Sequence, residues 1–260
     1  MVKGKKIYFI SDCHLGFPNH NESLEREKLL VKFLNEIEND AKEIYLLGDI
    51  FDFWFEYKRV VPRGFTRFLG KIAEFTDNGI PVHFFTGNHD IWVFDYLPAE
   101  TGVILHKNKL ITEFYGKKFL IAHGDGLGPC DKGFKRMKKV FTNPFAQWCF
   151  ARIHPNLGVK IASSMSHKSR YKLHPKELQF KGADKEWLIL YAKRKLENSH
   201  YDYFVFGHRH IPIKYKLTDN STFINLGDWM QNFTYGVFDG KTFELIRYYP
   251  EKRIFKYLNE

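Results

Sequence analysis

The feature that most constrains this chain is a buried strand that ends in metal-binding side chains. Residues 44–54 read IYLLGDIFDFW. The first four form an apolar run without polar alternation, which is typical of a strand buried on both faces of a parallel sheet. Gly48 and Asp49 follow at the carboxyl end of the strand, where open α/β sheets bind their ligands. The same pair also suits a turn or a helix cap, but the clusters described next favour Asp49 as the bridging ligand of a two-metal site.

Four further strand-like segments end in similar clusters. They are followed by Asp12 and His14, by Asn88 and His89, by His123, and by His208 and His210. Each of these residues alone is compatible with a cap, an Asx-turn or a structural histidine. Asp12 and His14 lie two apart on a segment that we expect to be extended, so their side chains should project to one side. Five such clusters at one edge of a sheet together predict a metal centre.

This mixture of ligands indicates hydrolytic chemistry on phosphate. Two divalent ions about 3.5–4 Å apart need a carboxylate between them to offset their repulsion. Carboxylate, amide and imidazole ligands without cysteine favour Mn²⁺, Fe²⁺ or Zn²⁺ in a catalytic rather than a structural site. A metal pair lowers the pKa of a bound water and neutralises phosphate charge during in-line attack. The sequence therefore predicts hydrolysis of a phosphoester or a pyrophosphate.

The order of the segments predicts an α/β fold. Helical spacing over 22–39 and 63–78 alternates with strand-like runs, and a hairpin turning at Gly116 follows. We find no linker, repeat or low-complexity tract, and expect one domain over 1–260. The three cysteines are far apart and form no CxxC pair, which favours a reducing cytosol over a disulfide framework. No apolar run reaches the roughly eighteen residues of a membrane span.

A basic and aromatic segment at about 127–200 interrupts this pattern, and we interpret it as an insertion. From 127 to 185 it holds 13 Lys and Arg against 3 Asp and Glu, which accounts for the whole net charge of +10. Candidate helices cover 134–141, 145–152 and 185–198, where aromatics such as Trp148 interleave with basic residues such as Arg152. A solvated helical face would carry compensating acidic residues. We therefore expect an anionic partner for this segment: a membrane surface, an anionic lipid or nucleic acid. Some of the aromatics must form the insertion's own core.

Taken together, the motifs resemble the signature of the calcineurin-like metallophosphoesterases. The matching residues are Asp12-x-His14, Gly48-Asp49-x-x-Asp52, Gly87-Asn88-His89-Asp90, His123 and Gly207-His208-x-His210, in the family's order. The resemblance implies a core of mixed β-sheets flanked by helices, and two divalent ions, Mn²⁺ before Fe²⁺ or Zn²⁺. It places Asp12, His14, Asp49 and His210 around one ion, and Asp49, Asn88, His123 and His208 around the other. His89 would stabilise the transition state or protonate the leaving oxygen, and Asp52, otherwise a turn or cap residue, would orient it.

A narrower resemblance covers nearly the whole chain. Residues 48–54, His123-Gly124-Asp125 with Asp131, and a helical insertion before Gly207-His208-x-His210 are similar to the UDP-2,3-diacylglucosamine pyrophosphohydrolases of lipid A biosynthesis. It implies hydrolysis of this nucleotide-activated lipid to UMP and 2,3-diacylglucosamine 1-phosphate at the cytoplasmic face of the inner membrane, with the insertion as a lid over the acyl chains. It also implies substrate contacts by Asn88, His89, Asp131, Phe134, Ser166, Lys168 and His208. The chain departs from that family at His89, where many members have arginine.

Three other functions stay open at this point. A nuclease of the same fold would use the basic segment for nucleic-acid phosphates, but the insertion is apolar and no second DNA-binding or dimerising segment is evident. We therefore expect no nucleic acid and no obligate protein partner. A soluble phosphodiesterase or phosphoprotein phosphatase would use the insertion as a specificity loop. A non-catalytic scaffold would typically have lost metal ligands, whereas every expected ligand is present here.

Overall fold

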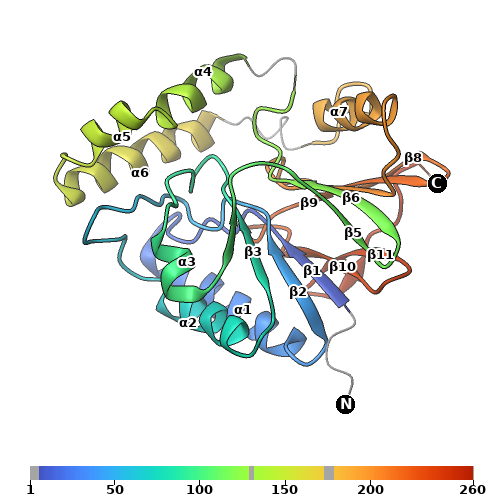
Figure 1. Cartoon of the computed structure of the whole chain (residues 1–260), viewed down its shortest axis with the longest axis horizontal. Coiled ribbons are helices and arrows are strands. Elements are labelled where there is room, and N and C mark those ends of the chain that lie inside the picture. Colours follow the sequence, from blue (N-terminus) through green and yellow to red (C-terminus); the bar gives the residue numbers. More distant parts are fainter. Residues whose placement is uncertain (1–5, 129–131, 173–178, 260) are drawn as a thin grey trace.

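Two mixed sheets lie face to face, with helices on the outer face of each (Figure 1). The structure is a computed structural model that describes residues 6–128, 132–172 and 179–259, without the side chains of 132–134, 163 and 165–172. In these ranges the first sheet has the strand order β12 (Arg253–Ile254), β11 (Phe243–Arg247), β10 (Thr234–Phe238), β1 (Lys6–Ile10), β2 (Ala41–Leu46), β3 (Val82–Phe85) and β4 (Ile104–His106). The second has the order β5 (Leu110–Phe114), β6 (Lys117–Ala122), β7 (Tyr203–Phe206), β9 (Ser221–Leu226) and β8 (Pro212–Thr218). The expected α/β fold of mixed sheets is confirmed.

Parallel pairing brings the candidate strand ends together. Strands β1 to β4 pair in parallel, and so do β6, β7 and β9 of the second sheet. The predicted hairpin at Gly116 is present as the antiparallel pair β5–β6. Because parallel strands end at the same edge of a sheet, the loops that follow β1, β2, β3, β6 and β7 meet at one end of the sandwich.

Strand β1 shows how an apolar run serves two cores. Ile7 and Phe9 point into the interior between the sheets, whereas Tyr8 and Ile10 point to the opposite face and pack with helix residues such as Phe33. Successive side chains of a strand alternate in direction, so an apolar run is buried on both faces. This double burial fixes the strand end that leads into the first ligand loop.

Four helices complete the outer layers (Figure 1). The first sheet is covered by α1 (His20–Ile37), α2 (Thr66–Asp77) and α3 (Tyr96–Thr101), and the second by α7 (Trp187–Leu196). Helix α1 begins after Asn19, whose side chain accepts the backbone N–H of Glu22 as an N-cap. The helices predicted over 22–39, 63–78 and 185–198 correspond to α1, α2 and α7 with ends shifted by one to three residues. Neither α3 nor β4 was predicted, because both are too short to show a periodicity.

The remaining helices, α4 (Lys132–Phe141), α5 (Pro144–Phe150) and α6 (Pro155–Lys172), form an arm that projects beside the ligand loops (Figure 1). The sequence predicted helices near α4 and α5 but none over α6, because a proline after residue 154 is also typical of a helix break. Pro155 is the first residue of α6, a position where a missing N–H costs no helical hydrogen bond. Trp92 attaches the arm to the sandwich, since its Nε1 donates to the carbonyl of Phe141 at 2.8 Å. None of the described helices is long and apolar enough to cross a membrane.

Candidate dimetal site

The predicted ligands gather at the end of the sandwich in overlapping clusters. Within each cluster the possible ligand atoms lie within 4.8 Å of one another. The clusters are Asp12 with His14 and His210, His14 with Asp49 and His89, and Asp49 with His123 and His208. Residues up to about 200 positions apart in the sequence are thus brought into one site, and Asp49 belongs to two of its three clusters.

Asp49 lies between the two halves of the site. Its Oδ2 is 3.8 Å from Nε2 of His14 and 3.4 Å from Nε2 of His123. Its Oδ1 accepts the backbone N–H of His89 at 2.8 Å, which fixes the plane of the carboxylate. One carboxylate oxygen that faces imidazoles of both halves has the placement that a bridging ligand requires.

The first half is built around Asp12. Its Oδ1 is 3.3 Å from Nε2 of His210 and 3.8 Å from Nε2 of His14. Its Oδ2 accepts from the Ser11 hydroxyl at 2.5 Å and from the His208 N–H at 2.8 Å. Oδ1 is buried and has no hydrogen-bond partner among the described residues. A buried carboxylate oxygen that no donor satisfies is costly unless a cation binds it, so the donor set suits a divalent ion.

In the second half, His123 is oriented from behind. Its Nδ1 donates to the carbonyl of Leu47 at 2.7 Å, so Nε2 points toward Asp49 and lies 3.3 Å from Oδ1 of Asn88. A backbone carbonyl behind the ring fixes the tautomer of a metal-binding histidine in this way. Carboxylate, amide and imidazole groups therefore lie close together here.

The protonation of the cluster shows how strongly these groups interact. Burial opposes ionisation of Asp49, but His123, His89 and His14 hold its pKa well below the ordinary value. Burial also opposes protonation of His123, yet Asp49 and Asp12 raise its pKa to about 10. Burial and the neighbouring His123 lower the pKa of His208 to about 3. Protons thus share the site with the carboxylates, and bound cations would displace them.

The ligand loops adopt a strained backbone. Asp12 and His14 have φ values of 54° and 44°, Asp49 has 52°, and His208 and His210 have 69° and 55°. This left-handed region costs a non-glycine residue about 1 kcal/mol or more, and such strain concentrates at functional sites. The expectation that Asp12 and His14 lie on an extended segment is therefore wrong. Their side chains converge because each residue turns sharply, and not because a strand alternates.

Glycine allows two of these loops to touch. A Cβ on Gly87 would lie 2.2 Å from Oδ1 of Asp49, and one on Gly48 would lie 2.7 Å from the backbone nitrogen of Gly87. Gly48 also has a φ of 82°, which favours glycine. The close contact between the loops after β2 and β3 places Asp49 and Asn88 in one site.

Comparison with known proteins agrees with this geometry. A model of the family described as calcineurin-like phosphoesterase matches residues 5–212. The chain belongs to the calcineurin-like phosphoesterase family. It is 41% identical over 252 residues to a UDP-2,3-diacylglucosamine hydrolase of Porphyromonas gingivalis, covering 92% of this chain and 96% of the relative. A second UDP-2,3-diacylglucosamine hydrolase, from Histophilus somni, is 28% identical over 228 residues, with 86% and 92% covered. Among solved structures, Yfce, a phosphoesterase from E. coli, aligns with a TM-score of 0.45 at 14% identity, covering 96% and 97%.

His89 is hydrogen-bonded to the backbone carbonyl of Asp52 and not to its carboxylate, which we expected to orient the ring. Nδ1 of His89 donates to the backbone carbonyl of Asp52 at 2.9 Å, while the nearer carboxylate oxygen of Asp52 is 3.8 Å away. That oxygen lies closer to Nδ1 of His14, at 3.5 Å. The Asp52 carbonyl thus orients His89, and the Asp52 carboxylate lies next to the imidazole of His14, a candidate metal ligand. The sequence does not distinguish the role of the Asp52 carbonyl from the role of its carboxylate.

Two supporting carboxylates were missed. Oδ2 of Asp228 is 3.5 Å from Nδ1 of His210, while its Oδ1 accepts three consecutive backbone N–H groups, of residues 230–232. The buried Asp90 accepts the N–H groups of Asp49, Ile50 and Gly87, which ties the loops after β2 and β3 together. Asp228 follows Gly227 at the end of a strand, just as Asp49 follows Gly48, and that repeated pattern was the available signal.

The substrate residues expected from the resemblance divide into three groups. Asn88, His89 and His208 lie in the site. Asp131 lies outside the described residues. Phe134 belongs to α4, and Ser166 and Lys168 to α6, but their side chains are also outside the described part of the chain. Their contacts with substrate stay predictions.

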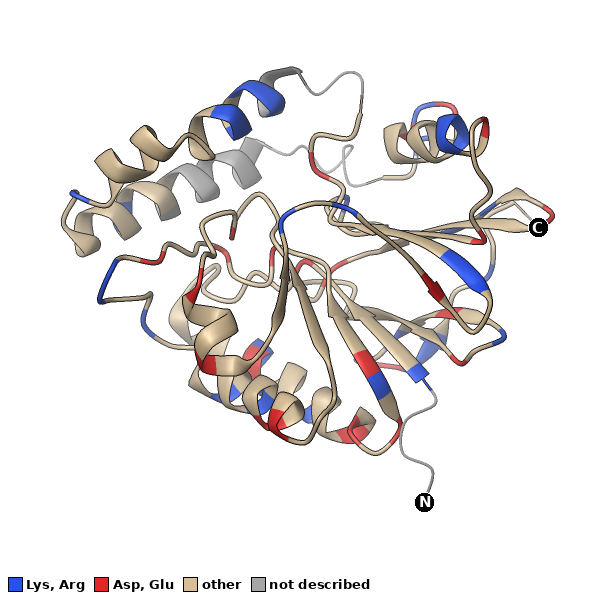
Figure 2. Ribbon diagram, viewed as in Figure 1, with Lys and Arg blue, Asp and Glu red and all other residues tan. Residues whose placement is uncertain are grey.

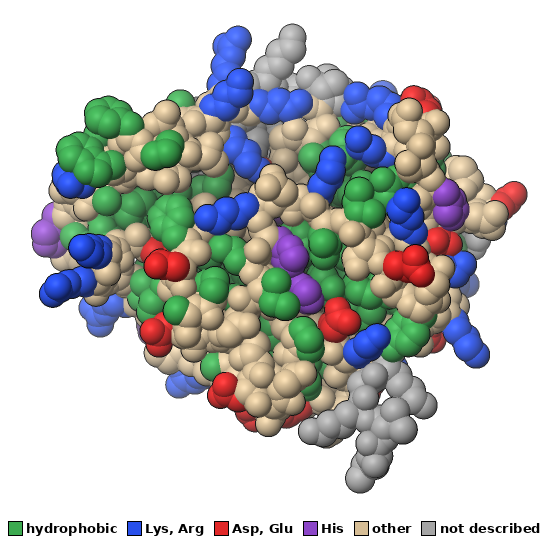
Figure 3. All heavy atoms as spheres, in the orientation of Figure 1, with side chains coloured by type: hydrophobic (Ala, Val, Ile, Leu, Met, Phe, Trp, Pro, Cys, Tyr) green, Lys and Arg blue, Asp and Glu red, His purple; other side chains and the backbone are tan. Residues whose placement is uncertain are grey.

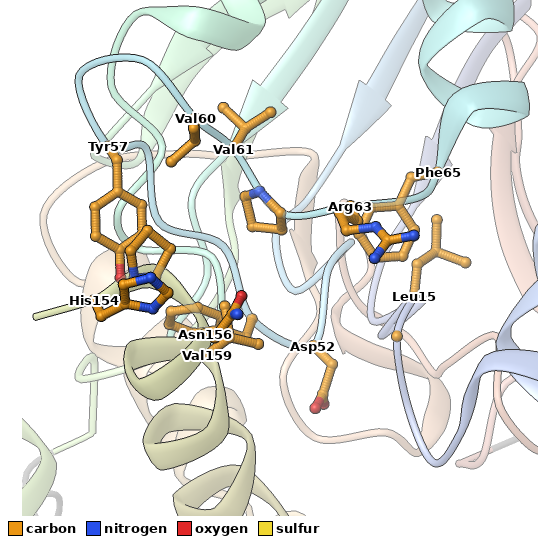
Figure 4. A pocket seen from close by; sticks show the side chains of 14 residues that line it. Leu15, Asp52, Tyr57, Val60, Val61, Arg63, Phe65, His154, Asn156 and Val159 are labelled. Atoms are coloured by element: carbon orange, nitrogen blue, oxygen red, sulfur yellow. The ribbon is translucent and has the colours of Figure 1, made fainter.

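Two apolar cavities open between the site and the arm. One has a volume of about 320 Å³, begins at Asn88 and His89, and is lined mainly by aromatic and aliphatic side chains of the sandwich and the arm: Phe53, Ile91, Trp92, Met137, Phe141, Phe150, Ile153 and Ile161. The other, of about 640 Å³, lies between the segment 57–65 and the start of α6 (Figure 4). Asp52 and Phe53 line both cavities. An apolar ligand bound there would therefore extend away from the proposed metal centre.

Proposed function

We propose that this chain hydrolyses the pyrophosphate bond of UDP-2,3-diacylglucosamine, a step of lipid A biosynthesis. One water is added across the P–O–P bridge, and the products are UMP and 2,3-diacylglucosamine 1-phosphate. The relative from Porphyromonas gingivalis supports this substrate, with 41% identity over 92% of the chain. The observation that carries the proposal is the direct opening of apolar cavities onto Asn88, His89 and Asp52 at the His and Asp clusters. A small polar phosphodiester would have no use for such cavities.

We assign the metal ligands as follows. Asp12, His14, Asp49 and His210 would hold one ion, and Asp49, Asn88, His123 and His208 the other, with Mn²⁺ before Fe²⁺ or Zn²⁺. Bound there, the ions would supply an activated water and offset the charge of the pyrophosphate. Asp228 and Asp52 would keep the rings of His210 and His14 in their orientation, and the carbonyl of Leu47 would do so for His123.

His89 would assist departure of the leaving phosphate oxygen. Because its Nδ1 is bonded to the carbonyl of Asp52, Nε2 is the ring nitrogen that would face the substrate. It would donate a hydrogen bond or a proton to the oxygen of the broken P–O bond. A positioned general acid of this kind typically contributes about 10²–10⁴-fold to the rate.

The arm would cover the acyl chains and contact an anionic membrane surface. Phe145 and Trp148 of α5 are 71% and 52% exposed and stack on each other at 5.9 Å. The guanidinium of Arg152 lies 3.6 Å from the Trp148 ring centre. Figure 3 shows exposed hydrophobic side chains over the arm with basic side chains close by. Exposed aromatics combined with positive charge are typical of an interfacial helix, and Phe134, Ser166 and Lys168 would contact the substrate from this arm.

The test is a product assay on the Mn²⁺-loaded protein. UDP-2,3-diacylglucosamine in detergent should yield UMP and the lipid monophosphate in equal amounts, and a chelator should stop the reaction. UDP-N-acetylglucosamine is the matched control, because it has the same pyrophosphate but no acyl chains to occupy the cavities, and it should be a poor substrate. If the protein cleaves a generic phosphodiester but releases no UMP from the lipid, the proposed metal centre would be supported and the proposed lipid substrate would be excluded.

A further inference from the structure

A polar cavity lies beside the site, next to His123. It has a volume of about 370 Å³, within the usual range for ligand pockets. Its walls are the carboxyl ends of β3 and β6, the loop between β4 and β5, and Lys138 of α4. In contrast to the two apolar cavities, it is lined by three lysines together with Thr86, Asn108 and Asp125. Figure 2 shows basic positions on the β4–β5 loop below basic positions of α4.

Two of the three lysines have no acidic partner among the described residues. Lys138 pairs with Asp125 at 2.6 Å. Lys107 and Lys109 are exposed and line the cavity, and the ammonium group of Lys107 lies 5.5 Å from the ring centre of Phe94. Two such ammonium groups at the mouth of a concave polar surface attract an anion and offer it hydrogen bonds.

The polar and apolar cavities meet at the metal-ligand candidates. His123 lines the polar cavity and Asn88 lines the apolar cavity of about 320 Å³. Nε2 of His123 lies 3.3 Å from Oδ1 of Asn88. The surface thus changes from basic and polar to aromatic and apolar across the proposed reaction centre. A substrate with a hydrogen-bonding nucleoside at one end, an anionic pyrophosphate in the middle and a lipid at the other end has the same order of polarity.

We propose that the polar cavity binds the nucleotide half of the substrate, its uridine monophosphate group, while the lipid half occupies the apolar cavities. The inference rests on the function proposed above. Lys107 and Lys109 would donate hydrogen bonds to the carbonyl oxygens of the base and to the ribose hydroxyls, and the Asn108 amide and the Thr86 hydroxyl would add further bonds to these groups. His106 adds an aromatic wall, stacked on Phe85 at 4.6 Å, against which a base can lie. Burial and the neighbouring His83 lower the pKa of His106 to about 4, so this wall is neutral at pH 7.

Binding of UMP to the Mn²⁺-loaded full chain, measured by calorimetry, tests the assignment. The variant is Lys107→Ala/Lys109→Ala, and the control is Lys241→Ala/Lys252→Ala, which removes the same charge from exposed positions that do not line the cavity. Inorganic phosphate is a second probe, since it would bind the metals without filling the cavity. We expect the double variant to raise the Kd for UMP by about 10- to 100-fold, as for loss of two charge-assisted contacts, with phosphate affinity and the control variant nearly unchanged.

Two results overturn the assignment. One is an unchanged Kd for UMP in Lys107→Ala/Lys109→Ala. The other is an equal loss of phosphate and UMP affinity, which would mean that the lysines only raise the general potential of the metal centre. Failure of the proposed function would give a different result. The protein would then not hydrolyse the lipid substrate, but Lys107→Ala/Lys109→Ala would still bind UMP more weakly than the natural sequence if the cavity binds the nucleotide.

Discussion

Substitution of Asp228 tests how the candidate site is supported, because one carboxylate oxygen holds the backbone of its own loop and the other faces His210. Oδ1 accepts the N–H groups of Met230, Gln231 and Asn232 at 2.8–3.0 Å, and Oδ2 faces Nδ1 of His210 at 3.5 Å. Burial opposes its ionisation, but His210 and the backbone N–H groups hold its pKa below the ordinary value. In Asp228→Asn the amide oxygen can still accept the three backbone N–H groups. The new NH₂ group, however, would face Nδ1 of His210, which also has to donate a proton if its Nε2 binds a metal ion, so this hydrogen bond is lost.

The magnitudes follow from these contacts. Hydrogen bonds to a charged acceptor contribute about 1 kcal/mol more than neutral ones, so three of them put the stability loss at about 2–3 kcal/mol. Loss of the acceptor behind His210 should weaken Mn²⁺ binding about 10- to 100-fold. Saturating Mn²⁺ should then restore most of the turnover, because His210 itself is still present.

The assay is the Mn²⁺ dependence of diester hydrolysis beside thermal unfolding of the same samples. Asp239→Asn is the matched control, since Asp239 accepts the N–H groups of Lys241 and Thr242 in a hairpin that bears no candidate ligand. It should lower stability somewhat and leave the Mn²⁺ dependence alone. A wild-type Mn²⁺ dependence in Asp228→Asn, or an equal shift in Asp239→Asn, would mean that Asp228 does not support metal binding by His210.

Three further outcomes are expected. His89→Ala should retain bound Mn²⁺ but lower kcat by about 10²–10⁴-fold; an unchanged kcat in product assays would remove it from the reaction. Phe145→Ser/Trp148→Ser should weaken sedimentation with anionic vesicles and leave hydrolysis of a soluble diester intact, whereas unchanged vesicle binding would place the membrane contact elsewhere. His106 has a folded-state pKa of about 4, below its ordinary value of 6.5, so the unfolded chain takes up its proton first. Stability should therefore fall as the pH drops from 6.5 to about 4, and His106→Phe should flatten this part of a urea-unfolding series.

Much of the fold and the meeting of the candidate ligands at one edge could be predicted, because both follow from local sequence patterns. Apolar runs identified β1, β2, β3, β6 and β7, and the Asp, Asn and His residues that follow them converge because parallel strands end at one edge. Helix α6 was missed because a proline at a helix start has the same sequence signal as a break. The left-handed backbone of Asp12 and His14 was missed because loop contacts impose it.

Support from distant residues was harder to predict. The orientation of His210 by Asp228, and of His89 by the carbonyl of Asp52, depends on which loops face each other in space. A backbone carbonyl has no sequence signal at all. The same holds for the polar cavity, since Lys107 and Lys138 lie on separate segments that only the fold brings together.

The most direct test of the proposed dimetal mechanism combines metal content with turnover in one pair of proteins. The natural sequence should bind two Mn²⁺ per chain and release UMP from UDP-2,3-diacylglucosamine. Asp49→Asn, which keeps the size of the side chain, should bind fewer than two ions and lose turnover by at least about 10³-fold, because the bridge between the ions is removed. Two tightly bound ions with near-normal UMP release in Asp49→Asn would contradict the dimetal mechanism proposed for this chain.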